Sequence, residues 1–133
     1  MRPSRFVTIG IIVAAASCGG SSSSPTGMTN NPPPTPPPAG SVTVTIQDFK
    51  FTPAVDTIKV GTTVQWMNNG PSEHSTTSDT GIWDSQGLTP PTGGAGGATF
   101  QHTFSQAGTF KYHCTFHPPS LYPMFVGTIV VTN

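Results

Sequence analysis

The sequence predicts an all-β fold, an antiparallel Greek-key β-sandwich, over residues 41–133. Two observations predict it. Short segments of this region alternate between apolar and polar residues with the period of two typical of half-buried strands, and turns containing Gly or Pro separate them. In addition, no window of helical length carries a clear apolar stripe with the period of 3.6 residues that marks an amphipathic helix.

The first four expected strands are rich in β-branched or aromatic residues, and turn signals mark their ends. Residues 42–46 read Val-Thr-Val-Thr-Ile, and Phe49 and Phe51 alternate around a lysine. Residues 55–60 are followed by Gly61, and residues 63–67 are followed by the turn sequence Asn-Asn-Gly-Pro. These local patterns predict strands without any information on how the strands pair.

Three further strands are expected at residues 99–104, 108–114 and 126–131, which again are rich in β-branched and aromatic residues. Residues 85–98 lie between the two groups of strands. They are rich in Gly and Pro, so we expect them to form a loop.

The composition limits the function classes open to the chain. Its 133 residues are enough for one ordinary domain. Only 8% of the residues are charged and the formal net charge is +0, so the chain lacks the basic surface that a nucleic-acid-binding protein needs. No segment reaches the roughly 18–20 apolar residues of a membrane-spanning helix. We therefore expect neither nucleic-acid binding nor a transmembrane span.

Residues 1–17 are expected to be a signal peptide, because Arg2 and Arg5 precede an apolar run over residues 6–16. The small residues directly before Cys18 resemble a lipobox, which predicts cleavage there and lipidation of Cys18. The alternative is ordinary secretory cleavage near the same place. In both cases we expect an exported protein. As a lipoprotein it would face the periplasm or the cell exterior and touch the membrane only through its lipid.

Residues 18–40 are expected to be a disordered tether between the lipidated Cys18 and the folded domain. They contain no charged residue, four consecutive Ser and many Pro. Ser-rich sequence is flexible and Pro-rich sequence favours an extended polyproline II chain. Such a segment can hold a domain away from an anchor but cannot form a core.

Cys114 is the one cysteine of the expected domain, so it cannot form a disulfide within it. His117 follows three residues later, Met124 lies further along the same segment, and His74 precedes Cys114 by forty residues. A thiolate and two imidazoles with a weak axial thioether define the blue-copper electron-transfer site. Each residue alone has an ordinary alternative, such as a surface His or a buried Cys. Their joint spacing predicts a copper site.

Other metals and the other histidines fit this pattern less well. Calcium or magnesium would need carboxylate oxygens, and the chain has only 5 Asp and Glu. A structural zinc site usually has paired Cys or His at short spacing, which the sequence lacks. His113 is adjacent to Cys114 on an expected strand and should point to the opposite face. His102 has no partner at ligand spacing.

These motifs extend over essentially all of residues 41–133. Residues 61–68 precede His74, residues 104–118 contain the Tyr-His-Cys-Thr-Phe-His-Pro run, and Met124 precedes Gly-Thr-Ile-Val-Val at 127–131. This arrangement resembles the plastocyanin/amicyanin branch of the cupredoxins, which are small type 1 (blue) copper proteins with a β-sandwich fold.

The resemblance implies that one copper ion per chain is bound by His74, Cys114, His117 and Met124. Two departures affect Met124. Six residues separate it from His117, more than the family usually has, and two residues rather than one separate it from Gly127. Filling a gap in the core is the alternative role for this flexible side chain.

A further departure lies next to the first histidine. Ser75 stands where the family often has an Asn that hydrogen-bonds near the thiolate. Groups around the ligands tune a metal centre, so this exchange predicts a change in the surroundings of the site and hence in its reduction potential.

The resemblance also implies that the protein carries single electrons between redox partners at the cell envelope, and is not an enzyme. The alternative is copper binding or delivery without an electron-shuttle role. A purely structural sandwich that binds no metal is a third possibility.

The segment after His117 is unusually apolar and includes Pro118, Leu121, Tyr122 and Phe125. In cupredoxins the second His exposes its ring edge, so we expect an apolar docking patch there. A patch of this size suits a weak, transient complex between a monomer and a redox protein. The alternative is that these side chains fold back onto the rim of the sandwich.

Overall fold

A computed structural model describes residues 40–133. The expected signal peptide and Cys18 lie outside the described residues, as does the expected tether except for its last residue, Gly40. None of residues 40–133 forms a helix that is long and apolar enough to cross a membrane.

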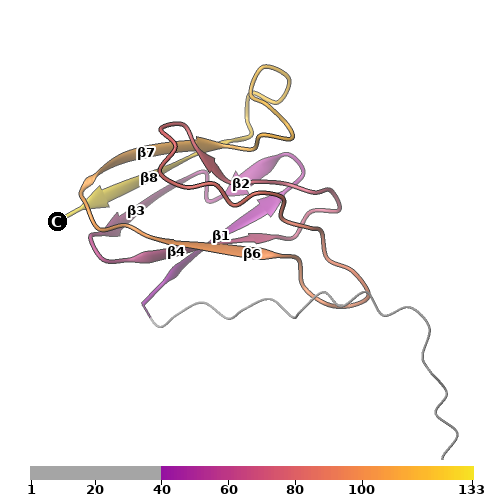
Figure 1. The fold of residues 1–133 in the computed structure, drawn as a ribbon, viewed down its shortest axis with the longest axis horizontal. Coiled ribbons are helices and arrows are strands. Elements are labelled where there is room, and N and C mark those ends of the chain that lie inside the picture. The colour runs from indigo at the N-terminus through magenta and orange to yellow at the C-terminus, as the bar shows by residue number, and fades with distance from the viewer. Residues whose placement is uncertain (1–39) are drawn as a thin grey trace, which may run out of the picture.

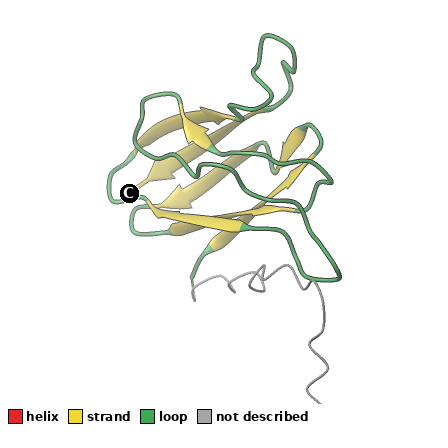
Figure 2. Ribbon diagram, turned by 45° about the vertical axis from the view of Figure 1, so that its right-hand side comes forward, coloured by secondary structure: helices red, strands yellow, loops and turns green. Residues whose placement is uncertain are grey.

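Eight strands form two four-stranded sheets that pack face to face (Figures 1 and 2). The first sheet has the order β2-β1-β4-β6, and the second has the order β3-β8-β7-β5. The strands of the first sheet are β1 (Val42–Gln47), β2 (Lys50–Thr52), β4 (Thr63–Asn68) and β6 (Thr99–Thr103). Those of the second sheet are β3 (Val55–Lys59), β5 (Thr77–Ser78), β7 (Gly108–His113) and β8 (Val126–Thr132).

The all-β sandwich is confirmed, and each of the seven expected strands is present with small shifts at its ends. Residues 85–98 form no strand, as expected for a loop. The expected list lacks β5, because a two-residue strand is too short to show alternation.

The sheets are mixed rather than purely antiparallel. β1 pairs with β4 in parallel, and β3 pairs with β8 in parallel, while the other pairs are antiparallel. The cause is a change of sheet along the chain. β2 turns back along β1, β3 joins the other sheet, and β4 returns to the first sheet in the direction of β1. Local sequence patterns predict the strands but carry no information on this pairing.

The core between the sheets is aromatic. Trp66 on β4 stacks on Trp83 at a ring-centroid distance of 5.5 Å and meets Tyr112 of β7 edge-on at 5.6 Å. Both Trp66 and Tyr112 are essentially fully buried. Tyr112 lies opposite Gly127 in the β7–β8 ladder. A Cβ atom at Gly127 would lie 2.1 Å from the Tyr112 ring carbon Cζ, so the ring occupies the space that a side chain would need.

We expect Gly127→Ala to lower the free energy of unfolding by about 1–3 kcal/mol, because the ring of Tyr112 must move to admit the methyl group. Chemical denaturation of the metal-free protein measures this change. Gly108→Ala on β7 is the matched control, since its Cβ would meet only the ring of Phe110, at 3.3 Å. Equal stability of the two variants would contradict this account of the β7–β8 contact.

Candidate metal centre

The end of β7 places the thiol. Along this strand Tyr112 is buried, His113 faces outward and Cys114, directly after the strand, is fully buried. The Nδ1 atom of His113 lies 2.7 Å from Oδ1 of Asp79, which confirms that His113 points away from Cys114. Strand alternation therefore sends the sulfur into the sandwich and the neighbouring imidazole out of it.

His74 lies in the segment that follows β4, and the backbone of the loop 85–98 holds it. The N–H of His74 donates to the carbonyl of Leu88 over 3.1 Å, and the N–H of Leu88 donates back over 2.7 Å. The buried amide of Asn68 donates to the carbonyls of Ser72 and Leu88, each over 2.8 Å. The position of this histidine is thus set by a buried, hydrogen-bonded turn.

His117 lies in the long loop between β7 and β8, which projects at the end of the sandwich away from the C-terminus (Figure 1). Its ring is half-buried. It packs against Phe49 at a centroid distance of 4.9 Å and meets Tyr122 edge-on at 5.2 Å. These aromatic contacts hold the imidazole at the rim.

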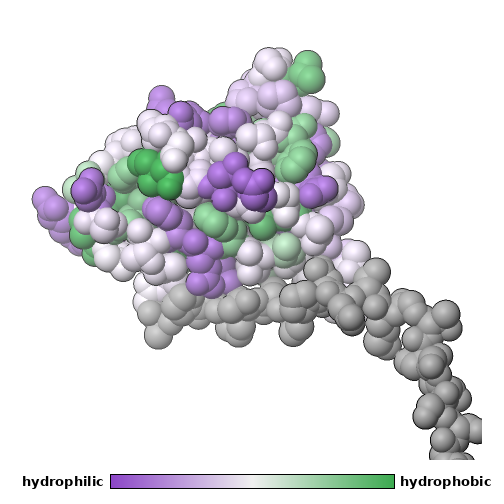
Figure 3. All heavy atoms as spheres, viewed as in Figure 1, coloured by the Kyte–Doolittle hydropathy of each residue, from purple (hydrophilic) through white to green (hydrophobic). Residues whose placement is uncertain are grey.

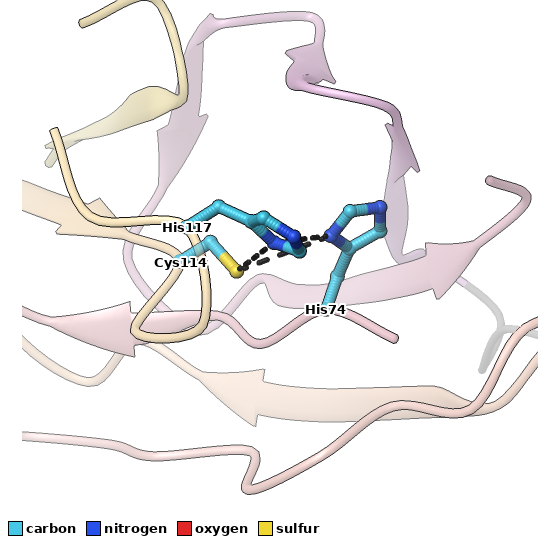
Figure 4. Close-up of side chains that lie close together, drawn as sticks. All are labelled: His74, Cys114 and His117. Carbon is cyan, nitrogen blue, oxygen red and sulfur yellow. Dashed lines mark hydrogen bonds between the residues drawn. The ribbon is translucent and has the colours of Figure 1, made fainter. Parts of the chain in front are cut away.

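The three side chains converge (Figure 4). The Nδ1 atoms of His74 and His117 are 3.3 Å apart, and Sγ of Cys114 lies 4.0 Å from the first and 3.6 Å from the second. All three donor atoms fall within 4.8 Å of one another. Two imidazole nitrogens and one thiolate at this spacing can bind a single metal ion, and this donor set fits copper.

Asp48 determines which nitrogen of His74 is available to bind a metal ion. Its Oδ1 lies 2.6 Å from Nε2 of His74, and its Oδ2 accepts a hydrogen bond from Oγ of Ser72 over 2.8 Å. A carboxylate only accepts, so Nε2 carries the proton and the lone pair of Nδ1 faces the other two donors. This orientation by a carboxylate is typical of metal-binding histidines.

The pKa shifts of this pair agree with its charge states. Burial lowers the pKa of His74, and the contact with Asp48 only partly offsets this, so the neutral ring is favoured. For Asp48, burial would raise the pKa, but hydrogen bonds from Ser72 and His74 outweigh it and lower the pKa. A neutral imidazole beside an ionised carboxylate is the state in which Nδ1 can bind a metal.

Sequence reasoning did not identify Asp48. It lies in the turn between β1 and β2, and only the pairing of β1 with β4 brings this turn beside the segment that carries His74. Gly70 makes the approach possible, because a Cβ atom there would lie 2.6 Å from Oδ1 of Asp48 and 3.1 Å from Nε2 of His74. The glycine of the Asn-Asn-Gly-Pro turn is the one local signal of a close approach.

Ser75 connects the two segments that supply the donors. Its backbone N–H points at Sγ of Cys114 over 3.3 Å, and its Oγ accepts a hydrogen bond from the N–H of Thr115 over 2.9 Å. Oγ also lies 2.9 Å from the hydroxyl of Thr115. The family often has an Asn at this position. In this chain the shorter side chain of Ser75 joins the two loops.

The structure does not bring Met124 to this cluster. Its side chain is 79% exposed, whereas the next residue, Phe125, is fully buried. Phe125 was expected among the exposed apolar residues of the loop, and the structure corrects this. His102, expected to lie outside the site, stacks on Trp83 at 5.2 Å.

Residues 38–132 match the family model for copper binding proteins of the plastocyanin/azurin family. The chain belongs to this family. A curated relative, amicyanin from Paracoccus denitrificans, is 34% identical over 79 residues, which cover 59% of this chain and 60% of amicyanin. The match therefore spans less than two thirds of that relative.

Solved structures of family members have the same fold. Amicyanin from Paracoccus versutus superimposes with a TM-score of 0.57 at 29% identity, covering 71% of this chain and 84% of amicyanin. A purple cupredoxin from Nitrosopumilus maritimus gives a TM-score of 0.54 at 27% identity, covering 68% and 99%. The family binds copper, and in this chain His74, Cys114 and His117 are placed to form the copper site.

We expect Asp48→Ala to weaken copper binding by about 10- to 100-fold, because His74 loses the partner that orients its ring. Competition with a chromophoric copper chelator measures the affinity. Asp79→Ala is the matched control, since it removes an aspartate bound to His113 outside the site. If both variants bind copper as tightly as the parent protein, Asp48 does not position His74.

Proposed function

We propose that this protein carries single electrons between redox partners. When bound, copper supplies a one-electron couple between Cu(II) and Cu(I). The observation that carries the proposal is the convergence of two imidazole nitrogens and one thiol, with His74 supplied by the segment after β4 and Cys114 and His117 by the segment after β7. This set of donors is that of the blue-copper electron-transfer site.

The contribution of the chain is to hold these donors in place. Cys114 is fixed by the end of β7, and the N–H of Ser75 points at its sulfur. His74 is fixed by Asp48 and by the backbone of Leu88. Because protein contacts set the donor positions, little rearrangement is needed when the charge at the site changes. Small rearrangement favours rapid electron transfer.

We propose an apolar docking surface beside His117, made of the exposed side chains of Phe116, Leu121 and Met124. These side chains are 50%, 74% and 79% exposed. They belong to the β7–β8 loop, whose projecting tip carries hydrophobic surface (Figure 3). Of the residues expected in the docking patch, Leu121 is retained, whereas two others are less exposed than expected. Tyr122 is half-buried against Phe49 at a centroid distance of 4.4 Å, and Pro118 is half-buried too.

The partner we propose is a redox protein with its own apolar surface. Residues 41–133 carry three Lys against the five acidic residues of the chain, so long-range electrostatic steering is weak. A small apolar contact suits a transient complex that forms and separates quickly. The protein would act as a monomer, with His117 as the ligand nearest to the partner.

We further propose that the protein is exported and acts at the cell envelope as a lipoprotein. The support is the charged, apolar and small-residue pattern that ends at Cys18. Labelling of the full chain with a fatty-acid analogue in an expressing bacterium, beside Cys18→Ser, tests the lipid anchor.

We expect Cys114→Ser to abolish the intense visible absorption of the copper-loaded protein and its electron transfer, because both depend on the thiolate. Absorption and EPR spectra, with the rate of electron self-exchange, measure these properties. His113→Ala is the matched control, since it changes the adjacent histidine outside the site. A pale Cu(II) spectrum that is the same in parent and Cys114→Ser would contradict the proposal. A normal spectrum with very slow self-exchange would favour copper delivery instead.

We expect Leu121→Ser combined with Phe116→Ser to slow electron transfer to the natural partner and to leave the copper spectrum unchanged. Stopped-flow kinetics with the partner from the source cell measures the rate. Val60→Ser is the matched control, because Val60 is 41% exposed beside the C-terminal end of β8, away from the β7–β8 loop. An unchanged rate in the double variant would exclude this docking surface.

A further inference from the structure

We propose that Phe125, and not Met124, closes the remaining side of the His74–Cys114–His117 site. The copper centre of this protein would then have three protein donors and an apolar ring where the family resemblance implies a thioether. The inference depends on the copper site and not on the role as an electron carrier.

The strand register places Phe125 on the face of the ligands. β7 and β8 are antiparallel, and the last pairs of their ladder are Tyr112 with Gly127 and His113 with Val126. Residues directly opposite each other in such a ladder share a face of the sheet. One further step along both chains leads to Cys114 and Phe125. Both are fully buried, as expected for side chains on the inner face.

The contacts of the Phe125 ring agree with this register. Its centroid lies 4.9 Å from that of His74, with the planes at 89°, and 6.0 Å from that of His117. On its other side the ring packs on Phe51 at 4.7 Å. Phe125 therefore contacts both imidazoles from within the core.

Met124 is directed elsewhere. Its side chain is 79% exposed, while the residues of the site that it would have to reach, His74 and Cys114, are fully buried. Met124 lies in the turn before β8, and its exposure shows that its side chain faces solvent, whereas Phe125 faces the core. This turn is fixed, because the N–H of Phe125 donates to the carbonyl of Tyr122 over 2.9 Å.

The two arrangements differ in the environment that they give the metal. A thioether is a weak axial donor, and the reduction potential of a blue-copper site depends on the axial group and on the surrounding hydrophobicity. A phenyl ring donates no lone pair and keeps water out. It should therefore stabilise the lower charge of Cu(I) relative to Cu(II) and raise the reduction potential.

Three single variants test the assignment: Phe125→Met, Phe125→Leu and Met124→Leu. We expect Phe125→Met to lower the Cu(I)/Cu(II) ratio in a fixed redox buffer by about tenfold, equivalent to about 59 mV for one electron, and to change the visible spectrum and EPR splitting. Phe125→Leu keeps an apolar, non-donor side chain and should leave the spectrum nearly unchanged. Met124→Leu should leave both the spectrum and the ratio unchanged.

Denaturation of each metal-free variant serves as a control, because exchanges between large apolar side chains usually cost less than about 1.5 kcal/mol. A raised Cu(I)/Cu(II) ratio with an altered spectrum in Met124→Leu would identify Met124 as the axial ligand and overturn the proposal. An unchanged spectrum and ratio in Phe125→Met would also overturn it. All three readouts come from the purified protein alone, so failure of a partner to accept electrons does not affect them.

Discussion

The buried end of strand β7 is the feature on which the rest of the site depends. Cys114 shares the inner face of the sandwich with Tyr112, whose ring lies against the backbone of Gly127 on the neighbouring strand. Since the sulfur cannot move towards the surface, the other donors must come to it. Two loops therefore converge at this end of the sandwich, one after β4 and one after β7, and Ser75 and Thr115 connect them by hydrogen bonds.

The convergence is achieved by hydrogen bonds within the protein. His74 is buried with a carboxylate partner, and the amide of Asn68 ties the same segment to the backbone around it. Buried polar groups that are fully partnered specify one arrangement, because any alternative would leave some of them unpaired. Such an arrangement is suited to the proposed electron-transfer role, in which the site would accept two oxidation states with little movement.

The loop between β7 and β8 has a buried side that faces the metal ligands and an exposed side that faces solvent. On the inner side Phe125 packs on both histidines, while on the outer side Leu121 and Met124 face solvent. Half-buried Tyr122 lies between the two and covers Phe49. A single apolar segment thus contributes both to the surroundings of the metal and to the surface that a partner would meet. Substitutions on its inner side would change the reduction potential of the copper, and substitutions on its outer side would change the proposed docking of a partner.

The sequence by itself determined seven of the eight strands and three of the donors. Strand alternation, turn residues and the spacing of Cys114 and His117 are local, so they can be read without knowing how the chain pairs. The tertiary structure alone decided the parallel pairing of β1 with β4, which brings Asp48 to His74. It also decided that Phe125 faces the core beside Cys114, because the register of β8 against β7 continues to this pair, while Met124 lies in the preceding turn. Contacts between segments far apart in sequence leave no periodic signal, and for that physical reason the partner of His74 and the ring of Phe125 became visible only in the folded chain.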